Sequence, residues 1–119
     1  MRRAALALVV VLIVAAGLVP ARAQAPYFAG KTIEIVVPFG AGGGTDIETR
    51  FLAPFFEKHI AGNPRVVVFN RSGGGSILGA NLYTLSAKPD GLQILATSGS
   101  TVIPYILGLP QVQYDFKKW

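Results

Sequence analysis

A short apolar segment followed by a loop of small residues occurs three times in this chain. The segments are residues 31–38 (KTIEIVVP), 65–70 (RVVVFN) and 92–97 (LQILAT). Glycines dominate the first two loops and serines the third, and a helical pattern follows each loop. Strand, loop and helix recurring at roughly 30-residue spacing is the pattern of βαβ units. The sequence therefore predicts an α/β fold with a parallel sheet covered on both faces.

Capping residues and glycines predict where the helices begin and end. Thr45 and Glu48 form a predicted capping box, so we expect the first helix to begin there and to stop near Gly62. We expect Ser76 to cap a second helix that runs to Ala87, and a third helix to span residues 101–107. The spacing predicts two apolar faces: Ile47, Phe51 and Phe55 in the first helix, and Leu78, Leu82 and Leu85 in the second. We also expect the aromatic residues of the first helix, Phe51, Phe55 and Phe56, to lie in the core.

The three loops are expected to meet at one edge of the sheet. Right-handed crossovers between parallel strands place every such loop at the carboxyl ends of the strands. We expect the strand order 2-1-3, with the first strand central. Ligands of open α/β sheets bind at this edge, beside the point where the strand order reverses.

These loops predict a site for an anion, built largely from backbone. Glycine lets the backbone approach a ligand closely, and the N–H groups that open a helix lack internal partners and carry the positive end of its dipole. A carboxylate would suit such a site as well as a phosphate. Arg71 could add a charge-assisted bond, and hydroxyl donors could come from five side chains: Thr45, Ser76, Ser98, Ser100 and Thr101.

Each of these residues also has a purely structural interpretation. The glycines could serve only the tight turns, and Thr45 and Ser76 could act only as caps. Asp46 is favoured as a partner of the helix dipole, because a carboxylate would repel an anionic ligand. Arg71 could be a rim residue, and His59 a surface residue at the end of a helix.

Catalytic and cofactor motifs are missing from this chain. The first loop has Thr45 where a dinucleotide fingerprint needs a glycine at its sixth position, and it lacks the lysine of a P-loop. No G-x-S-x-G elbow occurs. One histidine and no cysteine argue against triads and metal sites. Binding without chemistry, cofactor or metal is therefore the favoured interpretation. A small hydrolase that uses Ser98 or Ser100 stays an alternative.

Residues 1–23 have the layout of a secretory signal peptide. Arg2 and Arg3 precede an uncharged apolar stretch, Pro20 ends it, and Ala21-Arg22-Ala23 is an A-x-A cleavage site. We expect cleavage after Ala23 and a periplasmic location. An uncleaved membrane anchor is the alternative, because the stretch approaches the length of about 17–20 residues that spans a bilayer.

Charge gives no indication of a nucleic-acid partner. The chain has a formal net charge of +5, but three of its eleven basic residues lie in residues 1–23. The part beyond residue 23 has no basic run, which a nucleic-acid-binding surface would need.

Three motifs, together with the signal peptide, resemble those of a known family. They are residues 32–50, from Thr32 through Gly42-Gly43-Gly44-Thr45-Asp46, residues 70–80 (NRSGGGSILGA), and residues 89–99, which begin with Pro89-Asp90-Gly91. In this order they resemble the Bug family, the extracytoplasmic solute-binding proteins of tripartite tricarboxylate transporters. The resemblance covers roughly residues 27–116.

The resemblance implies a periplasmic-binding-protein-like fold of two α/β lobes around a ligand cleft. It implies a small carboxylate or related metabolite as ligand, and membrane permease subunits as partners. By position it implicates the three loops in ligand binding, and with Arg71 the predicted site is Phe39, Gly40, Ala41, Gly42, Gly43, Thr45, Asp46, Arg71, Gly73, Gly74, Gly75, Ser76, Ser98, Gly99 and Ser100.

Length distinguishes this chain from the family pattern. We expect residues 24–119 to form an incomplete N-terminal lobe with the second lobe missing, and binding by the truncated product to be impaired because a ligand would be buried on one side only. An exported α/β interaction module that dimerises without any ligand is the alternative function, since unpaired strand edges favour self-association.

Overall fold

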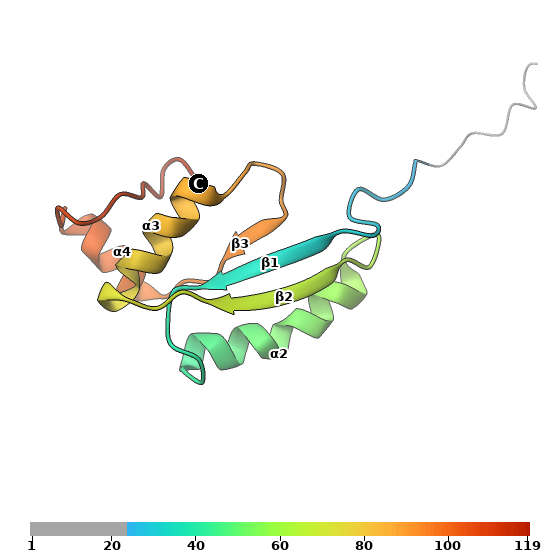
Figure 1. The fold of residues 1–119 in the computed structure, drawn as a ribbon, viewed down its shortest axis with the longest axis horizontal. Coiled ribbons are helices and arrows are strands. Elements are labelled where there is room, and N and C mark those ends of the chain that lie inside the picture. Colours follow the sequence, from blue (N-terminus) through green and yellow to red (C-terminus); the bar gives the residue numbers. More distant parts are fainter. Residues whose placement is uncertain (1–23) are drawn as a thin grey trace, which may run out of the picture.

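The computed structural model describes residues 24–119 (Figure 1). The predicted signal peptide and its cleavage site lie outside the described residues. The elements in chain order are β1 (Thr32–Val37), α2 (Gly44–His59), β2 (Arg65–Asn70), the 3₁₀ turn η1 (Gly74–Ser76), α3 (Ile77–Ser86), β3 (Gln93–Leu95) and α4 (Gly99–Ile106).

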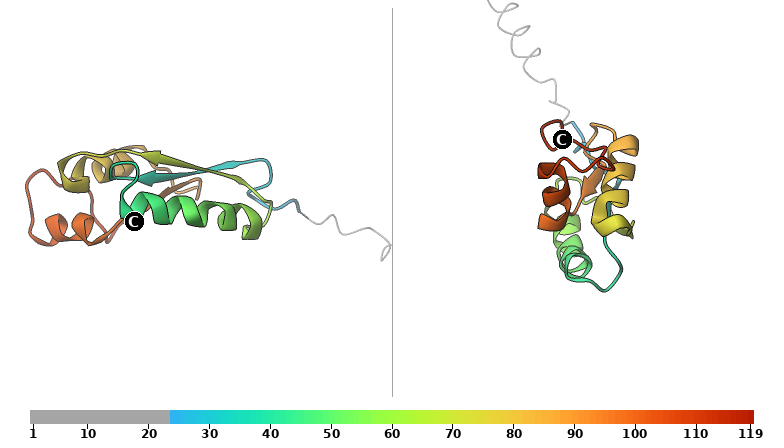
Figure 2. Two further views of the ribbon diagram at one scale, coloured as in Figure 1. Left: turned by 90° about the horizontal axis from the view of Figure 1, so that it is seen from below. Right: turned by 90° about the vertical axis from the view of Figure 1, so that its left-hand side faces the viewer.

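The three strands form one parallel sheet in the order β2-β1-β3, which confirms the predicted topology. Ile35 of β1 lies opposite Val68 of β2 and Ile94 of β3. Helix α2 covers one face of the sheet and α3 covers the other, while α4 lies beyond the carboxyl ends of the strands and contacts η1 and α3 (Figure 2). This is the arrangement of one α/β lobe. None of the helices within residues 24–119 combines the length and apolar character needed to cross a bilayer.

Two groups of apolar side chains hold the sheet and helices together. The first is on the central strand, where Ile33, Ile35 and Val37 are at most 2% exposed. The second joins Ile77 and Ala80 of α3 to the C-terminal segment, and its partly buried neighbours include Leu95, Tyr105, Leu109, Val112 and Phe116 around the buried Tyr114. The second group anchors the C-terminal segment to α3.

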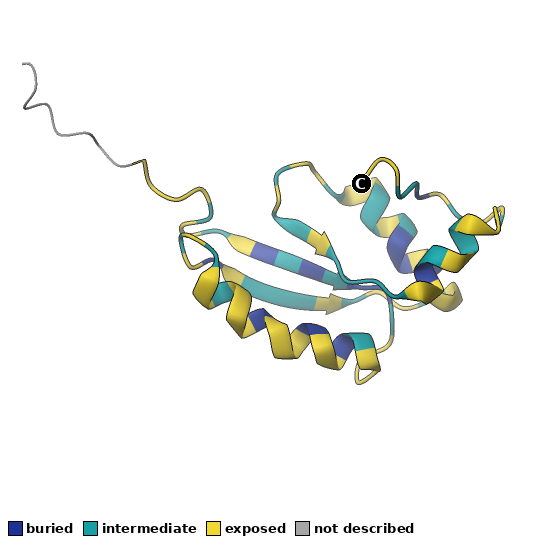
Figure 3. Cartoon of the chain, turned by 180° about the vertical axis from the view of Figure 1, so that it is seen from behind, coloured by how far each residue is buried: buried dark blue, intermediate teal, exposed yellow. Residues whose placement is uncertain are grey.

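The expectation that the aromatic residues of α2 belong to the core is wrong. Phe51 is 66% exposed and Phe55 is 50% exposed, whereas the buried positions of this helix are Asp46, Thr49 and Ala53. Phe56 is also exposed, and yellow marks most of the outer side of α2 in Figure 3. Periodicity found the apolar stripe but could not show which face meets the sheet, and here the small side chains meet it.

The same holds for α3. Leu78, Leu82 and Leu85 are exposed, and the helix packs through Ile77, Gly79 and Ala80 instead. The reason is visible at Gly79, where an added Cβ would overlap the carbonyl oxygen of Arg71 and the ring of Pro38. The backbone of α3 therefore approaches the ends of β1 and β2 too closely for a larger residue.

The three predicted helix starts also need correction. The N-cap of α2 is Gly43, and Thr45 lies inside the helix, so Thr45 and Glu48 form no capping box. Ser76 does occupy the N-cap position of α3, but its side chain makes no capping bond. The third helix begins at Gly99 rather than residue 101, and there the Ser98 hydroxyl accepts a bond from the N–H of Ser100 at 3.3 Å.

The close packing at Gly79 predicts that Gly79→Ala destabilises the fold by about 1–3 kcal/mol, the usual cost of overpacking. Urea unfolding measures this change. Gly99→Ala is the matched control, because a Cβ there meets nothing within 4 Å. Equal unfolding midpoints for the two variants would contradict the packing of α3.

The outward position of Phe51 predicts that Phe51→Ala changes the free energy of unfolding by less than about 0.5 kcal/mol. The same truncation at the buried Ile35 is expected to cost about 2–5 kcal/mol. A loss of about 3 kcal/mol or more at Phe51, measured by urea unfolding, would show that this ring is buried in solution.

Candidate functional site

The parallel sheet brings the three predicted loops to one edge. Residues 38–43 follow β1, residues 71–73 follow β2 and residues 96–98 follow β3, so each loop leaves the carboxyl end of its strand (Figure 1). The chain adds β2 on one side of β1 and β3 on the other, so the order of the strands reverses between β1 and β3. The loops after these two strands lie on either side of that point. Ligands of open α/β sheets bind at such a point.

The first loop is fixed by a buried carboxylate. Asp46 is only 3% exposed, although it lies in the first turn of α2. Its Oδ2 accepts the N–H of Gly42 at 2.8 Å, and its Oδ1 accepts Nε of Arg50 and Nδ2 of Asn70, both at 2.9 Å. One side chain therefore connects the loop, the helix and the end of β2.

Asn70 completes this connection. Its Nδ2 also donates to the carbonyl oxygen of Phe39 at 3.1 Å, and its Oδ1 accepts Nη2 of Arg50 at 2.8 Å. Asp46, Arg50 and Asn70 thus bond to one another, and the first two residues are one helical turn apart. We call these three residues the loop anchor.

The hydrogen bonds of the loop anchor lower the pKa of Asp46 below its ordinary value of 3.8. The largest cause is the N–H of Gly42, followed by the amide of Asn70, and the nearby Arg50 adds to them, while burial acts in the opposite direction. The carboxylate is therefore ionised at neutral pH and already has three donors. This geometry suits a residue that holds the loop in shape.

The end of the second loop and the turn η1 that follows it have unusual backbone geometry. Gly73, Gly74 and Gly75 all have positive φ, and so does Ser76, whose φ of 87° is uncommon for a residue with a side chain. Ser76 is 2% exposed and its Oγ has no hydrogen-bond partner within the described residues. Strained residues of this kind cluster at functional sites.

The helix that follows the third loop has a similar feature. Thr101, in the first turn of α4, is fully buried, and its Oγ1 has no hydrogen-bond partner within residues 24–119. Its carbonyl oxygen accepts the hydroxyl of Tyr114 at 2.7 Å, which ties the start of α4 to the C-terminal segment. The starts of α3 and α4 therefore each hold a buried hydroxyl with unused bonding capacity.

Most of the predicted site residues are accessible. The glycines of the first loop, together with Ala41, Gly74, Gly75, Gly99 and Ser100, are exposed, whereas Phe39, Thr45, Gly73 and Ser98 are half-buried. Arg71 is exposed and lines a hollow of about 130 Å³ with Glu34 and Gln93. The ligand contacts of all these residues stay predictions. In the part of the chain that is described, no three acidic or histidine side chains gather as a metal site would require.

Sequence reasoning did not identify two members of the loop anchor. Arg50 lies four residues after Asp46, a spacing at which opposite charges pair on a helix. The pair of Asp46 and Arg50 could therefore have been predicted from the sequence. Asn70 ends the neighbouring strand, and only the parallel register of β1 and β2 brings it to the first loop.

The loop anchor predicts that Asp46→Asn lowers the urea midpoint, while Glu48→Gln in the same helical turn leaves it unchanged, because Glu48 is exposed. Since the pKa of Asp46 is lowered by folding, its stabilising effect is complete above pH 3.8 and is lost as the pH falls through the lower folded-state pKa. The difference between wild type and Asp46→Asn should therefore shrink below about pH 3.8. A difference that grows on acidification would contradict this network.

Comparison with known proteins gives relatives but no matching family model. The chain is 36% identical over 110 residues to protein BugT of Bordetella pertussis, which covers 92% of this chain and 32% of BugT. It is 44% identical over 72 residues to a UPF0065 protein encoded in the gbd 5′ region of Cupriavidus necator, covering 60% and 21% of the two chains. A UPF0065 protein from a Pseudomonas species is 35% identical over 88 residues, covering 74% and 25%.

The chain thus spans about a third or less of the length of these curated relatives. The match to BugT takes in nearly all of this chain. Over the aligned residues, the chain belongs to the Bug family.

Proposed function

We propose that this chain carries the glycine-loop part of an extracytoplasmic solute-binding protein of a tripartite tricarboxylate transporter. Its ligand would be a small carboxylate or related metabolite, and its partners the membrane permease subunits that receive this solute. The chain would reach the periplasm through its signal peptide and would bind without catalysing a reaction.

The observation that carries this proposal is the convergence of three helix starts at one edge of the sheet. The first N–H groups of each helix lack intrahelical partners, and the helix dipole places partial positive charge there. A carboxylate is the complementary ligand. The exposed loop residues leave room for it to approach, and the loop anchor keeps the first loop in one conformation.

Affinity is expected to be low in this chain. Ligand pockets commonly bury most of the ligand surface, whereas one sheet edge covers one side. We therefore expect a dissociation constant in the millimolar range, which corresponds to about 4 kcal/mol of binding free energy.

Calorimetric titration of the purified chain with succinate tests the proposal. Succinate is expected to bind and its neutral analogue succinamide is not. Ala41→Glu places a negative charge in the exposed first loop and should weaken binding about tenfold or more. Ala61→Glu is the matched control, because Ala61 is also exposed but follows α2, beyond the other end of the helix.

Equal binding of succinate and succinamide would contradict an anion site. So would the absence of succinate binding, or equal effects of the two glutamate variants, because the negative charge at Ala61 is remote from the loops.

The alternative function, a self-associating interaction module, is favoured by one observation. The outer face of α2 exposes Ile47, Phe51 and Phe55, and β2 forms one edge of the sheet. Exposed apolar patches and open strand edges are typical of interaction surfaces. Sedimentation equilibrium distinguishes the two functions: a stable dimer that dissociates on Phe51→Ser and does not bind succinate would favour the module.

A further inference from the structure

The longer of the two outer strands, β2, directs part of its backbone away from the sheet. The N–H of Arg65 donates to the carbonyl oxygen of Lys31 at 3.0 Å, and β2 pairs with β1 residue for residue from there on. The backbone groups of alternate residues in a strand point to opposite sides. The N–H groups of Val66 and Val68 therefore point away from β1, toward the outer edge of the sheet.

One of these outward groups is bonded to a side chain of α2. Oε1 of Glu57 accepts the N–H of Val66 at 2.8 Å. Glu57 is half-buried and forms no ion pair within residues 24–119. A strand added to this edge would place a carbonyl oxygen on the same N–H. The carboxylate of Glu57 therefore occupies a position that an added strand would need.

The rest of this edge is accessible. A hollow of about 350 Å³ lies between α2 and β2, and Pro54, Glu57 and residues 66–68 are among its lining residues. Residues 66–70 (VVVFN) carry no charge, contain neither glycine nor proline, and are rich in β-branched side chains. Segments of this composition pair readily with copies of themselves when they lie on an open edge.

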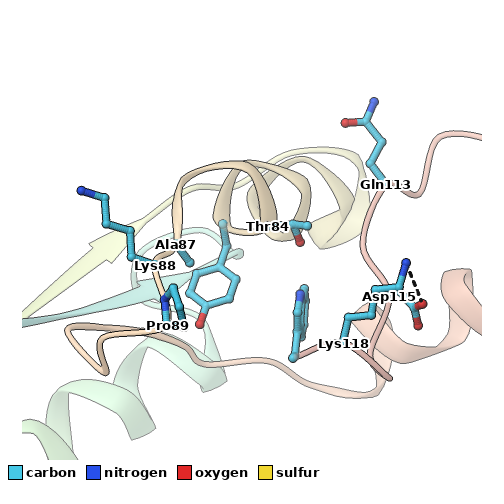
Figure 4. A pocket seen from close by; sticks show the side chains of 9 residues that line it. Thr84, Ala87, Lys88, Pro89, Gln113, Asp115 and Lys118 are labelled. Atoms are coloured by element: carbon cyan, nitrogen blue, oxygen red, sulfur yellow. Dashed lines mark ion pairs between the residues drawn. The ribbon is translucent and has the colours of Figure 1, made fainter.

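The other outer strand, β3, offers less edge. It has three residues, and its neighbours Leu92 and Ala96 bond to β1, so the carbonyl oxygen of Gln93 points outward. The hydroxyl of Tyr83 donates to this oxygen at 3.3 Å. Tyr83 also lines a hollow between the end of α3 and the C-terminal segment (Figure 4), where its ring meets Trp119 edge to face. Self-association through the sheet would therefore depend on β2.

A second copy of this chain fits the edge of β2 without electrostatic conflict. Two β2 strands can pair antiparallel about a two-fold axis, with Val66 of each copy opposite Val68 of the other. Arg65 then lies opposite Phe69, so no like charges meet along the strand. This pairing needs the N–H of Val66, which Glu57 occupies.

We propose that the outer edge of β2 is a surface for pairing with a second copy of this chain, and that Glu57 blocks it by occupying the N–H of Val66. Pairing would break one charge-assisted hydrogen bond in each copy, so the wild type is expected to stay monomeric. The inference goes beyond the proposed function, because it uses none of the glycine loops. It also differs from the self-associating module, in which the wild type dimerises.

Sedimentation equilibrium of the purified chain tests this inference. Glu57→Ala is expected to associate about tenfold or more strongly than the wild type, because no charge-assisted bond has to be broken. Glu57→Gln keeps a side-chain oxygen that can accept the N–H of Val66, so it should associate much more weakly than Glu57→Ala. Glu48→Ala is the matched control, because it removes an exposed carboxylate from the same helix.

A proline on β2 locates the interface. Val68→Pro removes an outward N–H and no bond to β1, and proline is tolerated on edge strands. Added to Glu57→Ala, it is expected to restore the monomer, and circular dichroism checks that each variant stays folded. The proposal is overturned if Glu57→Ala associates no more strongly than the wild type or Glu48→Ala, if Glu57→Gln matches Glu57→Ala, or if the double variant stays associated.

Amide hydrogen exchange tests the role of Glu57 in the wild type, without any variant. Val66 and Val68 both point their N–H groups outward, and Glu57 accepts that of Val66. After correction for sequence, the amide of Val66 is expected to exchange about tenfold or more slowly than that of Val68. Equal exchange of the two amides would overturn the proposal, and the solute-binding function would stand.

Discussion

The bonds of the Asp46 carboxylate hold together the parts of the molecule on which its function would depend. Through Gly42, Arg50 and Asn70 it fixes the first glycine loop to the start of α2 and to the end of β2. A glycine-rich loop has many conformations in the absence of such a contact, and ordering it upon binding would cost conformational entropy. The loop anchor removes part of that cost before any ligand arrives.

The strands and their order could be predicted from the sequence because local and global signals agree there. The β-branched run of β1 is apolar enough to be central, and right-handed crossovers leave few ways to connect three parallel strands. The helix faces could not be predicted in the same way. The apolar stripe of α2 contains Phe51 and Phe55. The side of α2 that faces the sheet is instead set by the bond of Asp46 to Asn70 in the loop anchor and by the small side chain of Ala53.

The candidate site shows the same division. Its place at the carboxyl ends of the strands follows from topology, and the family motifs pointed to its loops. The bond between Asn70 and Asp46 joins residues 24 positions apart and depends on the register of β1 and β2, which periodicity does not reveal. Ser76 has a backbone conformation that serine rarely adopts, and its buried hydroxyl makes no capping bond, so the expectation that this side chain caps α3 is wrong.

The loop anchor orders the first loop before any ligand binds, and amide hydrogen exchange at Gly42 tests this order most directly. The N–H of Gly42 is outside the helix, so only its bond to Asp46 can protect it there. We predict that this amide exchanges much more slowly in the wild type than in Asp46→Asn. Exchange of the wild-type amide at the rate of an unstructured peptide would contradict the account.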